Sequence, residues 1–167
     1  PICSLKTVKI GSVNWINKEI FSECQAFTEI EIEQAFVIDQ EAFSNCKNLE
    51  RVSIKNGFVT IWDRAFSGCT SLKEVNIGAN VQSIKTRAFS GCKNLKKISI
   101  PVSVEIIGLA AFSGSGIESI HLPANLKTIS TAAFSGCTNL KSVEFPEALT
   151  KIESRAFEKS GLVRMEL

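Results

Sequence analysis

The feature that most constrains this sequence is the pair Ala-Phe, which recurs at an interval that hardly varies. Successive copies are 22 or 23 residues apart, and three of them continue into an identical stretch that reads AFSGC. The pairs are Ala42-Phe43, Ala65-Phe66, Ala88-Phe89, Ala111-Phe112, Ala133-Phe134 and Ala156-Phe157, and Ile20-Phe21 extends the series towards the amino end. A fixed period of this length is typical of stacked coils, because one coil cannot bury its apolar face without a neighbour. The recurrence therefore predicts a solenoid.

An apolar triplet with the spacing L-x-x-V-x-I follows each pair. Clear copies are Leu72-Val75-Ile77, Leu95-Ile98-Ile100 and Leu140-Val143-Phe145. The alternation of apolar and polar residues indicates a half-buried strand, and equivalent strands of successive coils pair in parallel about 4.8 Å apart. Eight triplets therefore predict a continuous sheet wall about 35 Å long. Proline directly after three of the triplets, at Pro101, Pro123 and Pro146, marks where strand pairing ends.

A second apolar pair, such as Val81 and Ile84, returns the chain along the opposite wall. We therefore predict a β-rich α/β solenoid: a leucine-rich repeat superhelix with one parallel sheet wall, and with short return strands or 3-10 turns on the other. Residues 1–167 are expected to form a single domain of about seven repeats. The chain opens on Pro1 and stops after a triplet, so we expect a fragment without full caps. Its last strand, residues 162–167, is expected at an open edge or paired with another chain.

Two columns of residues are expected inside the solenoid. The phenylalanines should stack into an aromatic spine, and the cysteines three positions later should be small, buried, free thiols. A metal site is not expected, because a linear row of thiols does not converge tetrahedrally. Cys3 lies one position outside the column, so we expect it to be reactive or paired with a partner missing from this chain. The predicted columns are Phe43, Phe66, Phe89, Phe112, Phe134 and Phe157, with Phe21 before them, and Cys24, Cys46, Cys69, Cys92 and Cys137.

The unit as a whole resembles the BspA-like (Treponema-type) leucine-rich repeats. Two stretches carry the resemblance most fully, SIPVSVEIIGLAAFSGSGIESI and HLPANLKTISTAAFSGCTNLKSV, and the pattern covers nearly the whole chain. The asparagine slot of commoner leucine-rich repeats is held here by mixed residues, which argues against a continuous asparagine ladder. The resemblance implies a cell-surface or secreted protein of a microbe or protist parasite. It also implies adhesion to a protein ligand, whether a host protein, a matrix protein or another microbial surface protein.

Composition and motifs exclude several other functions. The net charge of +2 is spread over both signs, which gives no basis for nucleic-acid binding, and no apolar run is long enough for membrane insertion. The single histidine, His121, has no repeat counterpart, and an open sheet offers no pocket for a catalytic pair. We therefore expect a protein that is not an enzyme and needs no cofactor.

The polar residues between the apolar positions of each strand face outward and form the candidate protein-binding face. An arrangement of alternating sign is explained equally by a solvated charge ladder. Extended sheet walls are nevertheless common docking surfaces of solenoids. Trp62, in the return segment, is a further candidate contact because other coils have polar residues or glycine there. The candidate face comprises Glu29, Arg51, Glu74, Lys97, Asn76, His121, Glu144 and Arg164.

Two readings of the function remain open from the sequence. The first is a non-catalytic, protein-recognising module of the cell surface, which is also able to self-associate through its open carboxyl-terminal edge. The alternative is an intracellular scaffold or a structural spacer built from the same repeat.

Overall fold

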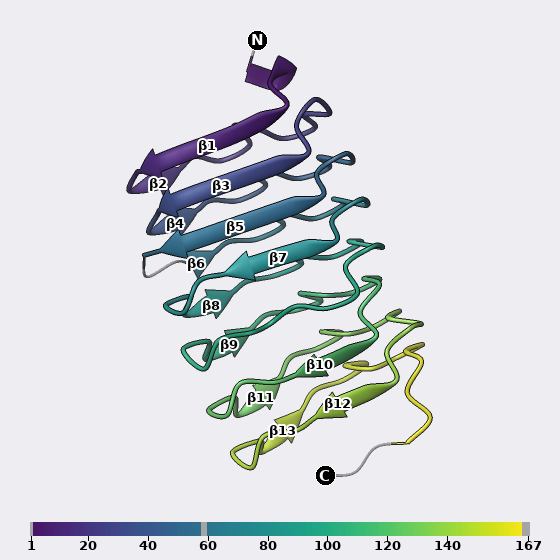
Figure 1. Ribbon diagram of the computed structural model, residues 1–167. Helices are drawn as coiled ribbons and strands as arrows, with labels where there is room; N and C mark the ends of the chain where they lie inside the picture. Colours follow the sequence, from purple (N-terminus) through teal and green to yellow (C-terminus); the bar gives the residue numbers. More distant parts are fainter. Residues whose placement is uncertain (1, 58–59, 165–167) are drawn as a thin grey trace.

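The computed structural model describes residues 2–57 and 60–164, and it is a stack of flat coils with a strand on each of two walls (Figure 1). The long wall carries the strands of the apolar triplets, and the return wall carries two-residue strands. Coils 1 to 4 each have a strand on both walls: β1 (Thr7–Ser12) and β2 (Trp15–Ile16), β3 (Glu29–Gln34) and β4 (Val37–Ile38), β5 (Arg51–Asn56) and β6 (Thr60–Ile61), and β7 (Glu74–Ile77) and β8 (Ser83–Ile84). Coil 5 has only the return strand β9 (Ile106–Ile107) among the described residues. Coils 6 and 7 again have both: β10 (Ser119–His121) and β11 (Thr128–Ile129), and β12 (Ser142–Glu144) and β13 (Lys151–Ile152).

All pairings are parallel and in register with the repeat. On the long wall, Ile30 of β3 pairs with Val52 of β5, and Val52 pairs with Val75 of β7. Equivalent residues of every coil therefore point the same way, so each apolar position of the triplet becomes a buried row. The predicted leucine-rich repeat solenoid is confirmed. Its helical content is smaller than an α/β description implies, because the described residues contain only one short 3-10 helix, η1 (Ile2–Ser4).

The predicted continuous sheet of eight strands is wrong in one respect. The long wall consists of a four-stranded sheet, β1-β3-β5-β7, and a two-stranded sheet, β10-β12, and the fifth triplet forms no strand between them. Its Leu95, Ile98 and Ile100 remain buried, so coil 5 keeps its phase without the ladder. The eighth triplet ends at residues 165–167, which lie outside the described residues.

The prolines account for the shorter strands of the carboxyl-terminal half. Strands β1, β3 and β5 each extend two residues past their triplet, whereas β10 and β12 end two residues before Pro123 and Pro146. Proline has no N–H to donate to a ladder, which is the reason the sequence predicted these ends.

The phenylalanines of the Ala-Phe pairs form one continuous stack through the core. Adjacent ring centroids from Phe21 to Phe157 are 5.1 to 5.5 Å apart, and the ring planes are within 7° of parallel. Phe27 and Phe145 meet the two ends of this stack edge-on. Because the stack spans every coil, it ties the seven coils to a single interior.

The corner that contains each Ala-Phe pair satisfies its backbone in two directions. In coil 3, the N–H groups of Arg64, Phe66 and Gly68 donate to carbonyls of the next coil. The intervening N–H groups donate to carbonyls three residues earlier in the same coil. Arg64 and Gly68 both have positive φ, 56° and 74°, and glycine recurs at the second of these positions because it adopts that conformation without strain. This arrangement leaves few buried backbone groups for side chains to satisfy.

The cysteine column is mostly as predicted, but Cys24 is not a free thiol. Cys46, Cys69, Cys92 and Cys137 are free and fully buried. Each of these four thiols donates a hydrogen bond, 3.1 to 3.2 Å long, to the carbonyl of a Phe in the preceding coil. Burial raises the pKa of the Cys92 thiol to about 12.

Cys24 instead forms a disulfide with Cys3, across a Cα–Cα distance of 4.9 Å. Among the described residues, no phenylalanine carbonyl of an earlier coil is available to accept a hydrogen bond from Cys24. The η1 segment instead contains its partner, Cys3. The expectation that Cys3 is reactive or paired outside this chain is therefore wrong.

Among the described residues, no helix is both long enough and apolar enough to span a lipid bilayer.

Candidate binding face on the long wall

The outward side chains of the long wall form two rows whose neighbours are set by strand register. Glu29, Arg51 and Glu74 are consecutive partners on β3, β5 and β7, and Asn76 lies beside them on β7. The register also brings together His121 of β10 and Glu144 of β12. The structure thus places six of the eight candidate residues on strands of one wall.

The other two candidates are placed differently. Lys97 belongs to coil 5, where the wall has no assigned strand, and Arg164 follows the last corner at the end of the described residues. These two positions are therefore not fixed by a sheet ladder, and their part in a binding face stays a prediction.

Coils 1 to 3 neutralise their own charges across the wall. Arg51 bonds to Glu29 at 3.2 Å, Lys9 lies 3.0 Å from Glu31, and Lys55 lies 3.6 Å from Glu31. The hydrogen bond from Lys9, helped by the charge of Lys55, holds the pKa of Glu31 below its ordinary value. The hydrogen bond to Glu29 likewise raises the pKa of Arg51. A partner docking on these coils would have to displace or desolvate ion pairs that already satisfy one another.

Sequence reasoning missed the third row of this network. Lys55 bonds to Glu33 at 2.9 Å, one position beyond the apolar triplet, and this contact raises the pKa of Lys55. The signal was available, because Glu33 and Lys55 are opposite charges in equivalent positions of adjacent coils. The candidate face comprised only residues within the triplet.

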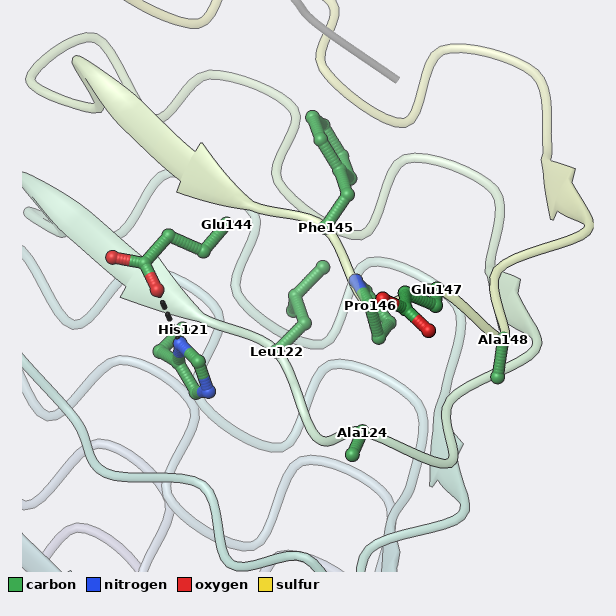
Figure 2. Close-up of a pocket in the computed structure, with 8 residues that line it drawn as sticks. All are labelled: His121, Leu122, Ala124, Glu144, Phe145, Pro146, Glu147 and Ala148. Atoms are coloured by element: carbon green, nitrogen blue, oxygen red, sulfur yellow. Dashed lines mark hydrogen bonds and ion pairs between the residues drawn. The ribbon is translucent and has the colours of Figure 1, made fainter.

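The carboxyl-terminal half of the wall has a different character. His121 Nδ1 lies 2.6 Å from Glu144 Oε2, and both side chains are about three-quarters exposed, 75% and 76%. Beside this pair is a hollow of about 610 Å³, which Figure 2 shows with its lining residues. The lining consists of His121, Leu122, Ala124, Glu144, Phe145, Pro146, Glu147 and Ala148. An apolar floor with a charged rim is what a protein side chain of mixed character would fit.

The hollow was not predicted, and one of its lining residues, Ala148, occupies a repeat slot whose side chain differs from coil to coil. In coil 5 the same slot holds Ser103, whose hydroxyl donates to the carbonyls of Ala79 and Val81 at 2.7 Å each. Ala148 has no side chain that can bridge coils in this way.

The thiols of the cysteine column are poor candidates for a nucleophile. The side chain paired with His121 is Glu144, and the free thiols are buried with raised pKa values at Cys69, Cys92 and Cys137. A thiol must ionise to act as a nucleophile, and a raised pKa in a buried site opposes this.

Comparisons with known proteins agree with this architecture. The sequence profile of the BspA type leucine rich repeat region matches residues 2–82 and 60–167, in six copies. No curated protein matches the chain.

Solved structures with the same fold come from several bacteria. A leucine-rich repeat protein of T. pallidum superposes with a TM-score of 0.69 at 24% identity, over 87% of this chain and 66% of that one. A leucine-rich cell surface protein of Faecalibacterium prausnitzii superposes with a TM-score of 0.56 at 25% identity, over 84% of this chain and 47% of that one. The chain thus spans less than two thirds of the length of either relative. Because the repeat profile matches from residue 2 to residue 167, the chain belongs to the BspA-type leucine-rich repeat family.

Proposed function

We propose that the chain is a surface-exposed or secreted recognition module that binds a protein ligand through the carboxyl-terminal half of its long wall. The observation that carries the proposal is the contrast along that wall. Coils 1 to 3 are closed by ion pairs between neighbouring strands, whereas coils 6 and 7 present a hollow with an apolar floor. Partners gain most from surface that is desolvated at little cost, so the second half is the better docking area.

Two features support a location outside the cell. A disulfide joins Cys3 to Cys24, and structural disulfides persist mainly in oxidising compartments. The F. prausnitzii relative is described as a cell surface protein. A microbial adhesin that binds host, matrix or other microbial surface proteins fits both features. An intracellular scaffold or spacer would have to keep this disulfide in a reducing environment.

Binding to immobilised extracellular-matrix proteins and to whole cells tests the proposal. Two variants reverse charge on the long wall, Lys97→Glu and Glu144→Lys, and Lys127→Glu is the matched control on the return wall. We expect at least one ligand to bind the wild type, and both long-wall variants to lose affinity while the control does not. If all three variants bind as tightly as the wild type, the long wall is not the binding surface.

Self-association through the carboxyl-terminal edge is a second candidate. In the earlier coils, corner N–H groups donate to the following coil, as Phe134 does to Ala156. Among the described residues, the N–H groups of Arg155, Phe157 and Lys159 have no acceptor of this kind. Sedimentation over a range of concentrations tests this candidate: a species that stays monomeric throughout would contradict it.

A further inference from the structure

Both tryptophans of the chain lie on the return wall, within three adjacent coils. Strand register aligns Trp15 of β2 with Val37 of β4, and Val37 with Thr60 of β6. The residue after each buried isoleucine forms a second outward row, in which Asp39 of coil 2 is beside Trp62 of coil 3. The strands β2, β4 and β6 lie side by side in Figure 1. The two indoles therefore lie at diagonal corners of one small patch, with Val37 and Asp39 between them.

The aromatic residues of this patch are exposed and are not required by the repeat. The exposed fraction is 59% for Trp15 and 41% for Trp62, and Phe36 next to Val37 is also 41% exposed. Equivalent positions in later coils hold no aromatic residue: they are Ser83, Ile106, Thr128 and Lys151 in the first row, and Lys85, Gly108, Ser130 and Glu153 in the second. Large aromatics held in water without a packing role are typical of contact residues.

The charge within the patch is negative and uncompensated. Asp39 makes no ion pair among the described residues, and its Oδ1 accepts a hydrogen bond from the N–H of Gln40 at 2.6 Å. The nearby Glu41 is already paired with Arg64 at 3.1 Å, and Glu19 with Lys18. Lys85 borders Trp62 on the coil 4 side, so a cation is repelled there and favoured at Asp39.

The spacing suits a cation placed between the rings. Two strand steps along the stack and two residues along the strand put the Cα atoms of Trp15 and Trp62 about 12 Å apart. Both indole side chains are long enough to reach from these positions towards a cation held above coil 2 at Asp39, where cation–π attraction can act. A guanidinium also stacks flat on aromatic faces and bonds to carboxylates, which an ammonium ion does less well.

We propose that the return wall of coils 1 to 3 is a second binding site, which takes an arginine side chain presented by a protein partner. The guanidinium bonds to Asp39, and the indoles of Trp15 and Trp62 flank it. This site lies on the wall opposite the one in the proposed function, so either assignment can fail without the other. It gives the solenoid two contact surfaces that face apart.

The composition of the chain provides a specific readout. The sequence contains two tryptophans and no tyrosine, so tryptophan fluorescence reports on this patch alone. We expect a hexa-arginine peptide to change the emission of the oxidised full-length chain in a saturable way. A hexa-lysine peptide should act more weakly and a hexa-glutamate peptide should have no effect. Added salt should weaken the response, because the contact is partly electrostatic and exposed.

Three variants separate the site from general effects. Asp39→Asn keeps an oxygen for the Gln40 N–H but removes the charge, and we expect a loss of affinity of at least fivefold. Trp15→Ala removes one exposed indole, and we expect a loss of about two- to fivefold. Glu153→Gln, in the same row as Asp39 but on coil 7, is the matched control and should bind as the wild type does. Thermal unfolding of each variant shows that it is folded; none of the three residues is in the core.

Several results would overturn this assignment. One is the absence of a saturable change in emission with hexa-arginine up to millimolar concentration. Another is equal affinity of Asp39→Asn and the wild type. A third is a saturable response to a neutral oligosaccharide such as cellohexaose with none to hexa-arginine, which would assign the aromatic patch to a glycan.

Discussion

At the scale of single residues, the thiols show how a repeat uses one side chain for two purposes. Each free cysteine fills a small apolar slot and also donates to a phenylalanine carbonyl of the coil before it. Ser115 occupies this slot in coil 5 and lies 3.3 Å from Cys137 Sγ, so a hydroxyl is tolerated there. In coil 1, where the described residues offer no such carbonyl, the cysteine of the column forms a disulfide instead.

Alkylation of the chain without reductant tests this assignment of cysteines. In the native state we expect slow labelling of all four free thiols, because they are buried and their Sγ–H groups are hydrogen-bonded. After denaturation we expect four labels per chain, and six only after reduction. Mass spectrometry counts them directly. Six labels on the denatured, unreduced protein would show that Cys3 and Cys24 are not bonded.

Buried thiols also predict how stability depends on pH. Burial raises the pKa of Cys92 in the folded state from an ordinary value of 9.0 to about 12, so the folded protein holds this proton at a pH where the unfolded chain releases it. The contribution of this group to stability is therefore complete below pH 9 and is lost progressively as the pH rises towards 12.

Denaturant unfolding of the wild type and of Cys92→Ser at several alkaline pH values measures this effect. The serine variant lacks the thiol, so its free energy of unfolding should decline less steeply as the pH rises. Lysines titrate in both proteins, so the difference between the two pH profiles reports on Cys92 alone. Parallel declines would show that Cys92 does not titrate differently in the two states.

At the scale of the element, glycine explains why some coils are one residue shorter. The loop that reads Cys-x-x-Leu in coil 4, residues 92–95, shortens to Ser115-Gly116-Ile117 in coil 5. A Cβ on Gly116 would meet the carbonyl oxygen of Lys93 at 2.0 Å. The shorter loop is therefore possible only because the backbone passes directly against the preceding coil.

Two alanine substitutions two residues apart test this explanation. Gly116→Ala should destabilise the protein by about 1–3 kcal/mol, because the neighbouring backbone must move. Gly114→Ala meets nothing within 4 Å, and its cost is that of a positive φ of 66°, about 1–2 kcal/mol. Urea unfolding measures both. A smaller loss at Gly116 than at Gly114 would contradict the close approach.

At the scale of the whole molecule, the ring stack makes the core continuous. Phe89 contacts a ring on each side, at 5.4 and 5.5 Å, whereas Phe157 contacts the ring of Phe134 on one side. We expect Phe89→Ala to cost about 3–5 kcal/mol and Phe157→Ala to cost less. Solenoid stability is a sum over neighbouring units, so the central change should also split the unfolding transition.

Calorimetry measures both the midpoint and the width of that transition. Phe89→Leu keeps most of the volume without the ring, and it should lie between the wild type and Phe89→Ala. An equal effect of the central and terminal alanine substitutions would show that the stack is not the shared core.

The sequence predicted the solenoid and its core well, because both depend on residues that repeat. The ring stack from Phe21 to Phe157 and the in-phase strands could be predicted from the repeat period alone. The Cys3–Cys24 bond was missed because Cys3 is out of register with the cysteine column. The hollow beside Glu144 was missed because its lining includes residues that do not repeat, such as Ala148. Non-repeating features depend on the ends and on exceptions, which a periodic pattern does not describe.

The corner hydrogen bonds have a consequence for how such a protein evolves. Alternate corner N–H groups donate to the next coil, and the N–H groups of the long wall donate to both neighbouring coils, so interior units offer and require similar sets of partners. Duplication or loss of one unit in the gene therefore leaves its flanking units with matching surfaces. The length of the molecule can therefore change in discrete steps without a new fold.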